Sequence, residues 1–167
     1  KGIVPEVWPL YGGLFGSGEA KKILSAADMM LLAGVAGREF RGEPLLNEYS
    51  AKLVEVNVQA NEIGVKGAVI QGVVGNVNMV LGQIVDLLKT MIKGERNPPS
   101  ILAEVRRMEK EAEVKMAEDV MPMHPAIAIK GIGRILADDG IATSEAGQIG
   151  DFALRYIKAK NPNTLVK

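Results

Sequence analysis

The sequence has no cysteine, few aromatic residues (4%) and no excess of either charge, with 20 basic and 20 acidic side chains among 167 residues. The absence of cysteine excludes disulfides and thiolate metal sites, and it favours an intracellular, cytoplasmic protein. The balanced charge argues against nucleic-acid binding, which needs a surplus of basic residues. No apolar run reaches the roughly 18 residues that a membrane-spanning helix requires. We therefore expect a globular protein that meets neither a membrane nor nucleic acid.

The sequence is rich in glycine, with 19 residues, and in short apolar runs, and this combination favours α/β packing over a β-sandwich. After a helix-prone segment at 19–27, the runs at 29–37, 51–58 and 68–74 have the length and composition of buried parallel strands. Buried strands that alternate with helices predict a parallel sheet with helices on its faces. We expect a partial, Rossmann-like domain.

The clearest single element is a helix over about 77–93. Its apolar residues recur at three- and four-residue steps and form one stripe: Val77, Val80, Leu81, Ile84, Leu87, Leu88 and Met91. Asn76 can cap its start and Gly94 can end it.

A charged helix over 101–120 follows. Its apolar positions are sparse and its pairs Arg107–Glu111 and Glu111–Lys115 are spaced for ion pairing, so we interpret it as a solvated linker helix.

The last part of the chain repeats the α/β pattern once, as a truncated second unit. A helix after Pro125, a short strand at 141–144, a loop at 145–150 and a helix at 151–160 are expected. One strand cannot form a sheet. The strand at 141–144 therefore joins the first sheet or pairs with residues outside this chain, unless the segment from Thr164 opens a further strand.

Small and amide residues follow each of the three predicted strands of the first sheet. In parallel sheets, ligands bind beyond the carboxyl ends of the strands, and amide side chains suit a nucleotide because they both donate and accept hydrogen bonds. The candidate residues for this nucleotide-binding edge are Gly34, Asn57, Gln59, Gly75 and Asn76. Glycines after strands are also common in plain tight turns, which would explain them without a ligand.

A second candidate is the segment between the last strand and the last helix. Gly147, Gln148 and Ile149 could present backbone amides to an anion, or they could form a plain connecting turn. The glycine-rich stretch 12–18 fits no phosphate-binding motif. The single histidine, His124, precedes Pro125 and is better placed to cap a helix than to bind zinc. No nucleophile–base pair and no metal site can be named, so the residues alone indicate no catalytic group.

Five segments, in this order, resemble the thiamine-diphosphate-dependent enzymes of the acetolactate synthase and 2-oxoacid decarboxylase superfamily. Residues 1–16 resemble the pattern K-G-x-x-P-E-x-H-P-L-x-x-G-x-x-G, with a tryptophan in the place of the histidine. Residues 27–40 resemble A-D-L-x-L-x-x-G-x-R-F-D-D, and 51–64 resemble A-K-x-I-x-I-D-I-D-P-A-E-I-G. Residues 68–88 are similar to the strand and helix that close the central domain, and 124–162 to the start of the diphosphate-binding domain.

This resemblance implies a partial central domain at 1–94, a linker at 95–123 and the beginning of the thiamine-diphosphate-binding domain at 124–167. It also implies a parent enzyme that uses thiamine diphosphate and magnesium to decarboxylate or condense a 2-oxoacid. The family's activating glutamate and its G-D-G…N-N motif are not in this sequence. Only Gly147, Gln148 and Ile149 match positions near the diphosphate, and Ile149 replaces a common histidine.

In the acetolactate synthase branch, the central domain also holds flavin adenine dinucleotide (FAD). Here the family's arginine falls on Ala36, and its acidic positions are Asn57, Gln59 and Asn76, which retain hydrogen bonding but remove charge.

The sequence therefore leaves two hypotheses for the function of the chain. In the first, the chain is a fragment of such an enzyme, inactive alone and without bound cofactor, whose partners are the remaining domains and further copies in a homo-oligomer. The first residue, Lys1, favours this fragment hypothesis because it is not methionine. In the second, the chain is a stand-alone nucleotide-binding or non-catalytic subunit.

Overall fold

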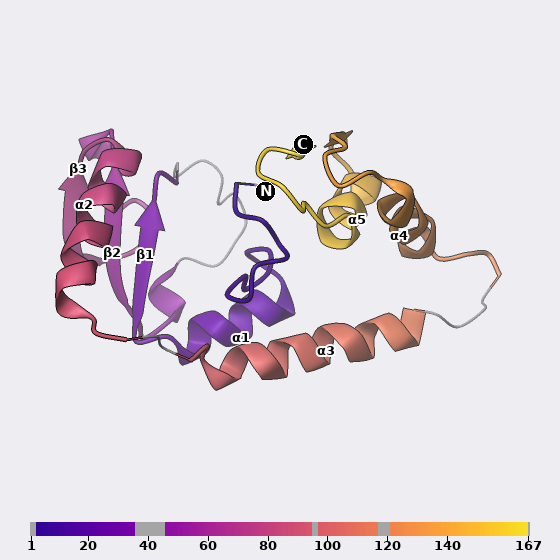
Figure 1. The fold of residues 1–167 in the computed structure, drawn as a ribbon, viewed down its shortest axis with the longest axis horizontal. Coiled ribbons are helices and arrows are strands. Elements are labelled where there is room, and N and C mark those ends of the chain that lie inside the picture. Colours follow the sequence, from indigo (N-terminus) through magenta and orange to yellow (C-terminus); the bar gives the residue numbers. More distant parts are fainter. Residues whose placement is uncertain (1–2, 36–45, 95–96, 117–120, 167) are drawn as a thin grey trace. The chain divides into compact units, whose positions relative to one another are not determined.

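The computed structural model describes residues 3–35, 46–94, 97–116 and 121–166, and its elements are drawn in Figure 1. The chain forms two compact units. We call Leu24–Asn97 the sheet unit, and Lys1–Ile23 with Pro98–Lys167 the helical unit. The domain boundaries at 1–94, 95–123 and 124–167 rest on the family resemblance and stay a prediction.

The sheet unit is built on three parallel strands, which confirms the predicted α/β class. The strands are β1 (Met29–Ala33), β2 (Lys52–Asn57) and β3 (Val69–Val74), in the order β1-β2-β3. Two short 3-10 helices, η2 (Leu46–Glu48) and η3 (Ala60–Glu62), lie in the connections. Met30 and Leu53 pair across β1 and β2 and are both buried, and Val56 is fully buried in the centre.

Helix α2 (Val77–Met91) lies along one face of this sheet (Figure 1). The predicted cap is confirmed, because the side-chain oxygen of Asn76 accepts hydrogen bonds from the backbone N–H groups of Asn78 and Met79. The first half of the apolar stripe is half-buried, whereas Leu87, Leu88 and Met91 are 62%, 42% and 74% exposed. The described residues therefore cover only the beginning of the stripe.

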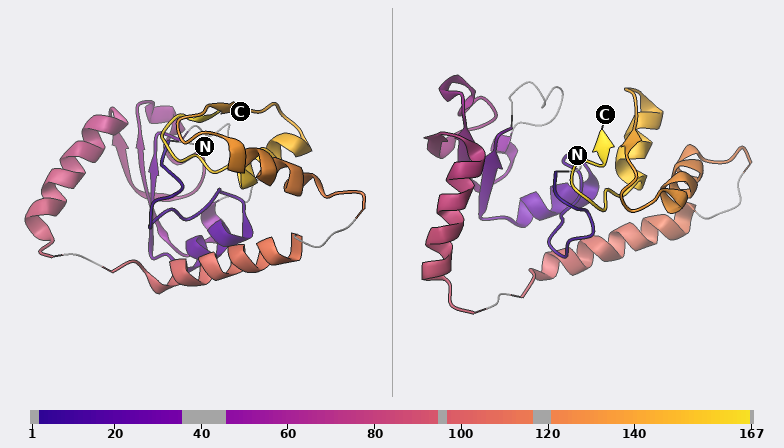
Figure 2. Two further views of the ribbon diagram at one scale, coloured as in Figure 1. Left: turned by 45° about the vertical axis from the view of Figure 1, so that its right-hand side comes forward. Right: turned by 45° about the horizontal axis from the view of Figure 1, so that its top comes forward.

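The helical unit contains most of α1 and every element from α3 onward. They are α1 (Gly18–Ala26), α3 (Ser100–Met116), α4 (Pro125–Ile135), β4 (Ala142–Thr143), α5 (Gln148–Tyr156) and β5 (Leu165–Val166). Helices α4 and α5 pack side by side in both views of Figure 2. β4 pairs in parallel with β5 in a separate two-stranded sheet, so the residues near the end of the chain supply the strand's partner.

Two expectations about the helical unit are wrong. The last helix is Gln148–Tyr156, not 151–160, so the predicted loop at 145–150 includes its first turn. The buried positions Gly150 and Ala153 explain the earlier start, because their three-residue spacing extends the packed face toward the start of the helix. The helix at Ser100–Met116 is not fully solvated, since Leu102 and Val105 are 8% and 2% exposed. Two apolar residues one turn apart are enough to bury one edge of a charged helix.

The remaining expectations for this charged helix can be checked only in part. The predicted ion pair Arg107–Glu111 is present at 2.6 Å on the exposed surface. The side chain of Lys115 and residues 117–120 lie outside the described part of the chain. None of the helices in the described ranges combines the length and the apolar character that crossing a membrane would take.

Candidate functional site

The structure brings the three predicted strand ends together at the carboxyl edge of the sheet. The backbone N–H of Gly34 donates to the carbonyl of Val56 at 2.9 Å. The N–H of Gly75 donates to the carbonyl of Asn57 at the same distance. The parallel topology therefore places the predicted nucleotide-edge residues as neighbours.

The amide side chains at this edge are used by the protein's own backbone. Asn57 is 6% exposed; its Nδ2 donates to the carbonyl of Val35 at 3.3 Å, and its Oδ1 accepts from the N–H of Gln59 at 3.2 Å. The oxygen of Asn76 caps α2 at 3.0 and 3.3 Å. Of the three predicted amides, only Gln59 has an exposed side chain that makes no such contact with the described residues.

The two glycines of the edge have a packing role as well. Gly34 has φ +67°, and a Cβ there would lie 3.1 Å from Cγ2 of Val77. A Cβ on Gly75 would lie 3.0 Å from Cγ2 of Val80. Both residues therefore allow α2 to approach the strand ends closely. Nucleotide binding here stays a prediction, and Ala36 lies outside the described residues.

The second predicted site, Gly147, Gln148 and Ile149, forms the start of α5. Gly147 is the N-cap, with φ 123° and ψ 175°, and it offers no side chain to the first turn. A Cβ at Gly147 would meet no atom within 4 Å, and Ile149 is 57% exposed. The first amides of the helix are therefore accessible from open space. Asp151 adds one carboxylate to the same turn, which disfavours a nearby anion.

Ser144 is a polar residue near this loop that the sequence did not reveal. It directly follows β4, and its backbone N–H donates to the carbonyl of Val166 at 3.0 Å. Its side-chain hydroxyl is buried and has no hydrogen-bond partner among the described residues. A buried hydroxyl of this kind usually has a partner, so a ligand or water near the end of β4 would satisfy it.

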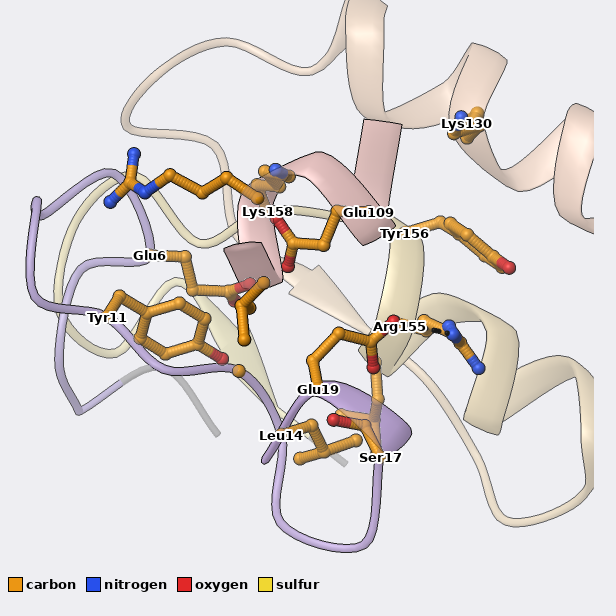
Figure 3. A pocket seen from close by; sticks show the side chains of 14 residues that line it. Glu6, Tyr11, Leu14, Ser17, Glu19, Glu109, Lys130, Arg155, Tyr156 and Lys158 are labelled. Carbon is orange, nitrogen blue, oxygen red and sulfur yellow. Dashed lines mark hydrogen bonds and ion pairs between the residues drawn. The ribbon is translucent and has the colours of Figure 1, made fainter. Parts of the chain in front are cut away.

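A cavity of about 140 Å³ in the helical unit was also missed by the sequence analysis. Its lining comes from the loop before α1, from α1 itself, from α3 and α4, and from the end of α5 with the residues that follow (Figure 3). Tyr11 and Glu6 lie on one side, and Arg155 and Tyr156 lie on the other (Figure 3). Because no motif joins these distant segments, nothing in the sequence marks them as one site.

Carboxylates surround the phenol of Tyr11. Burial raises the pKa of Tyr11 above its ordinary value, and the negative charges of Glu6 and Glu109, with a hydrogen bond to Glu6, raise it further. Glu6 is held in place because its N–H donates to the carbonyl of Ala159 at 2.9 Å while its Oε1 accepts from the Ala159 N–H at 3.1 Å.

Cationic groups also line the cavity. The guanidinium of Arg155 is 3.2 Å from Oε1 of the largely buried Glu19. Arg155 and Lys130 both lie near the Tyr156 ring, at 5.8 and 5.7 Å from its centroid. Lys158 also lines the cavity. Acidic and basic side chains therefore line the same small space.

The histidine is a structural residue, as predicted. His124 caps α4, since its Nδ1 accepts from the N–H of Ala126 at 3.2 Å, and Pro125 takes the first helical position. In the described ranges, no three His, Cys, Asp or Glu side chains are grouped to hold a metal ion.

Comparisons with known proteins show the fold. No protein-family model and no curated protein sequence match the chain. The chain is similar to a solved X-ray structure of an enzyme from Mycobacterium smegmatis that is proposed to depend on thiamin diphosphate, with a TM-score of 0.66 and 18% sequence identity. The match covers 98% of this chain and 30% of the other. Nearly the whole chain therefore has the fold of a segment of a much longer protein.

Proposed function

We propose that the chain is part of a thiamin-diphosphate-dependent lyase or transferase that decarboxylates or condenses a 2-oxoacid, in the manner of acetolactate synthase. One observation carries this proposal: over 98% of the chain, the fold matches a segment of a longer enzyme that is proposed to depend on thiamin diphosphate. The order of the five sequence segments supports it independently. The parent's substrate would be a small 2-oxoacid, and its other domains and further copies of itself would be the partners of this chain.

Within the parent, the chain serves as a scaffold and as one part of the cofactor-binding region. The start of α5 fits a diphosphate group, because the first turn has no side-chain cap and the space beside Gly147 is open. Gln148 and Ile149 would donate backbone N–H groups to it. The orphaned hydroxyl of Ser144 is a further polar group near the same loop.

Thiamin diphosphate, when bound, supplies the carbanion-stabilising chemistry that decarboxylation of a 2-oxoacid needs. The residues of this chain bind and orient, because the sequence contains neither a G-D-G motif nor a pair of adjacent asparagines that could hold magnesium. FAD at the sheet edge is not part of the proposal, since the side chains of Asn57 and Asn76 already bond to the backbone.

The first experiment reads the gene on both sides of the segment that encodes this chain. The proposal expects an open reading frame in both directions, with a G-D-G motif downstream of Lys167. An initiator methionine directly before Lys1 and a stop codon directly after Lys167 would favour the stand-alone subunit instead.

The second experiment tests α5 in the longer protein through binding of thiamin diphosphate, measured by calorimetry. Gln148→Pro removes one N–H at the first helical position, where proline is tolerated, and should weaken binding roughly tenfold. Gln148→Ala keeps the N–H and is the matched control. Equal affinities of the two variants for thiamin diphosphate would show that the start of α5 does not belong to the binding region. Tight, stoichiometric binding of thiamin diphosphate and magnesium by this chain alone would contradict its role as a fragment.

A further inference from the structure

We propose that the cavity of the helical unit binds a small free amino acid as its zwitterion. The ammonium group would lie among Glu6, Tyr11 and Glu109, and the carboxylate would face Arg155. This inference is independent of the proposed function, because none of these residues belongs to the start of α5 or to the sheet edge.

The acidic side of the cavity offers acceptors for an ammonium group. Glu109 on α3 is half-buried, and no hydrogen bond or ion pair from another described residue reaches its carboxylate. Glu6 is fixed by its two hydrogen bonds with Ala159, so its carboxylate is already oriented. A half-buried carboxylate without a donor is unfavourable, and a cation beside Glu109 would relieve that cost.

The acidic side also has the electrostatic character that a cation needs. The raised pKa of Tyr11 reflects, after burial, the negative potential of Glu6 and Glu109 at its hydroxyl. The same potential that opposes a phenolate favours an ammonium group at this point.

The opposite side of the cavity holds the guanidinium of Arg155. Arg155 retains one ion pair, with Glu19, and its planar guanidinium carries further donors that suit a carboxylate. Figure 3 shows Tyr11 and Glu6 across the cavity from Arg155. A ligand with one charge would match only one of these sides, whereas a zwitterion matches both.

The size of the cavity limits the ligand. Its volume of about 140 Å³ is close to that of a cavity of roughly 150 Å³ that accommodates benzene, a molecule of about six non-hydrogen atoms. Alanine has the same number of non-hydrogen atoms. Leu14, Val105 and Leu154 also line the cavity and provide apolar surface for a methyl side chain. A metal ion is a poor alternative, because no metal-binding cluster occurs among the described residues.

Three probes test the charge requirement on the unmodified chain: L-alanine, L-alaninamide and N-acetyl-L-alanine. L-Alanine has both charges, L-alaninamide lacks the carboxylate, and the N-acetyl derivative lacks the ammonium group. L-Alanine should give a saturable change in the NMR signals of the Tyr11 ring, and each derivative should bind roughly tenfold more weakly. The proposal is overturned if L-alanine gives no saturable change, or if either derivative binds equally well.

A pair of variants tests the position of the ammonium group. Glu109→Gln should weaken binding of L-alanine roughly tenfold, because it removes the charge from the proposed acceptor. Glu111→Gln is the matched control, since Glu111 is exposed on the same helix, pairs with Arg107 and does not line the cavity. Unchanged affinity in Glu109→Gln would refute the placement. If that variant does not fold, the three probes still decide the question on the unmodified chain.

Discussion

The buried ion pair between Glu55 and Lys66 allows a quantitative test of the sheet unit. Nζ of Lys66 lies 2.9 Å from Oε1 of Glu55, and the two side chains are 2% and 0% exposed. The other carboxylate oxygen accepts a hydrogen bond from the N–H of Gly64, also at 2.9 Å. We consider the substitution Lys66→Met, which leaves the carboxylate on the central strand without its counter-ion.

The expected loss of stability in Lys66→Met follows from two opposing contributions. With an effective dielectric constant of about 20, charges 2.9 Å apart attract by about 6 kcal/mol. Removing both ions from water costs several kcal/mol for each, so the intact pair contributes little net stability. Removing Lys66 alone eliminates the attraction while Glu55 remains buried, and we expect a loss of about 3–5 kcal/mol. The double variant Glu55→Leu with Lys66→Met should recover most of this loss, because no buried charge remains.

Amide hydrogen exchange along β2 is the appropriate assay, because it reports the opening free energy of the sheet unit separately from the helical unit. Lys89→Met is the control, since Lys89 pairs with Asp86 at 3.2 Å on the exposed surface and should contribute less than about 1 kcal/mol. The reasoning is refuted if Lys66→Met costs no more than the control, or if the double variant is as unstable as the single one.

Three further predictions concern local contacts. Asn76→Ala should lower the free energy of unfolding by about 1 kcal/mol, measured in urea, because two capping hydrogen bonds to α2 are lost, whereas Asn76→Asp should retain them. The hydrogen bond from Lys22 holds the pKa of Glu104 below its ordinary value. The stability that this contact contributes is therefore fully present above the pKa of Glu104 in the unfolded state, and it is lost as the pH falls through the pKa in the folded state. Lys22→Met should raise the pKa of Glu104, measured by NMR titration. An unchanged pKa would show that Lys22 is not the cause of the lowered value. Gly72→Ala would place a Cβ 2.6 Å from Cγ2 of Ile63 and should lower the free energy of unfolding, measured by thermal denaturation, by about 1–3 kcal/mol. In the double variant with Ile63→Ala, this clash is absent, so the part of the loss that comes from the clash should disappear.

The sheet and its main helix could be predicted because their signals are local. Continuous apolar runs ending in glycine or asparagine predict β1 to β3, and the stripe with its Asn76 cap predicts α2. The pairing of β4 with β5 was only an open alternative, since strands of two residues carry no periodicity and register depends on tertiary contacts. The start of α5 was misplaced because a glycine-rich segment predicts a loop, whereas the packing of Gly150 extends the helix.

For the candidate sites, the position of residues along the sheet edge could be predicted from the sequence, but their side-chain contacts could not. Parallel topology is enough to predict that Gly34, Asn57 and Gly75 share one edge, and the structure confirms that placement. The partners of Asn57 could not be predicted, because an amide bonds to whatever the loop geometry brings near it. The cavity at Tyr11 was equally hidden, since its charged residues come from separated segments that only the tertiary fold brings together.

The helix starts distinguish the two predicted binding regions. At α2 and α4, the side chains of Asn76 and His124 accept from the first free N–H groups, so these positions already have acceptors. At α5 the N-cap is Gly147, which has no side chain to accept them. Since uncapped N–H groups in open space require water or an anion, the start of α5 is the better place for a diphosphate among these three. At the sheet edge, by contrast, Asn57 and Asn76 already bond to the protein's own backbone and the glycines allow α2 to pack closely, so a nucleotide there would have fewer free amide groups to bind.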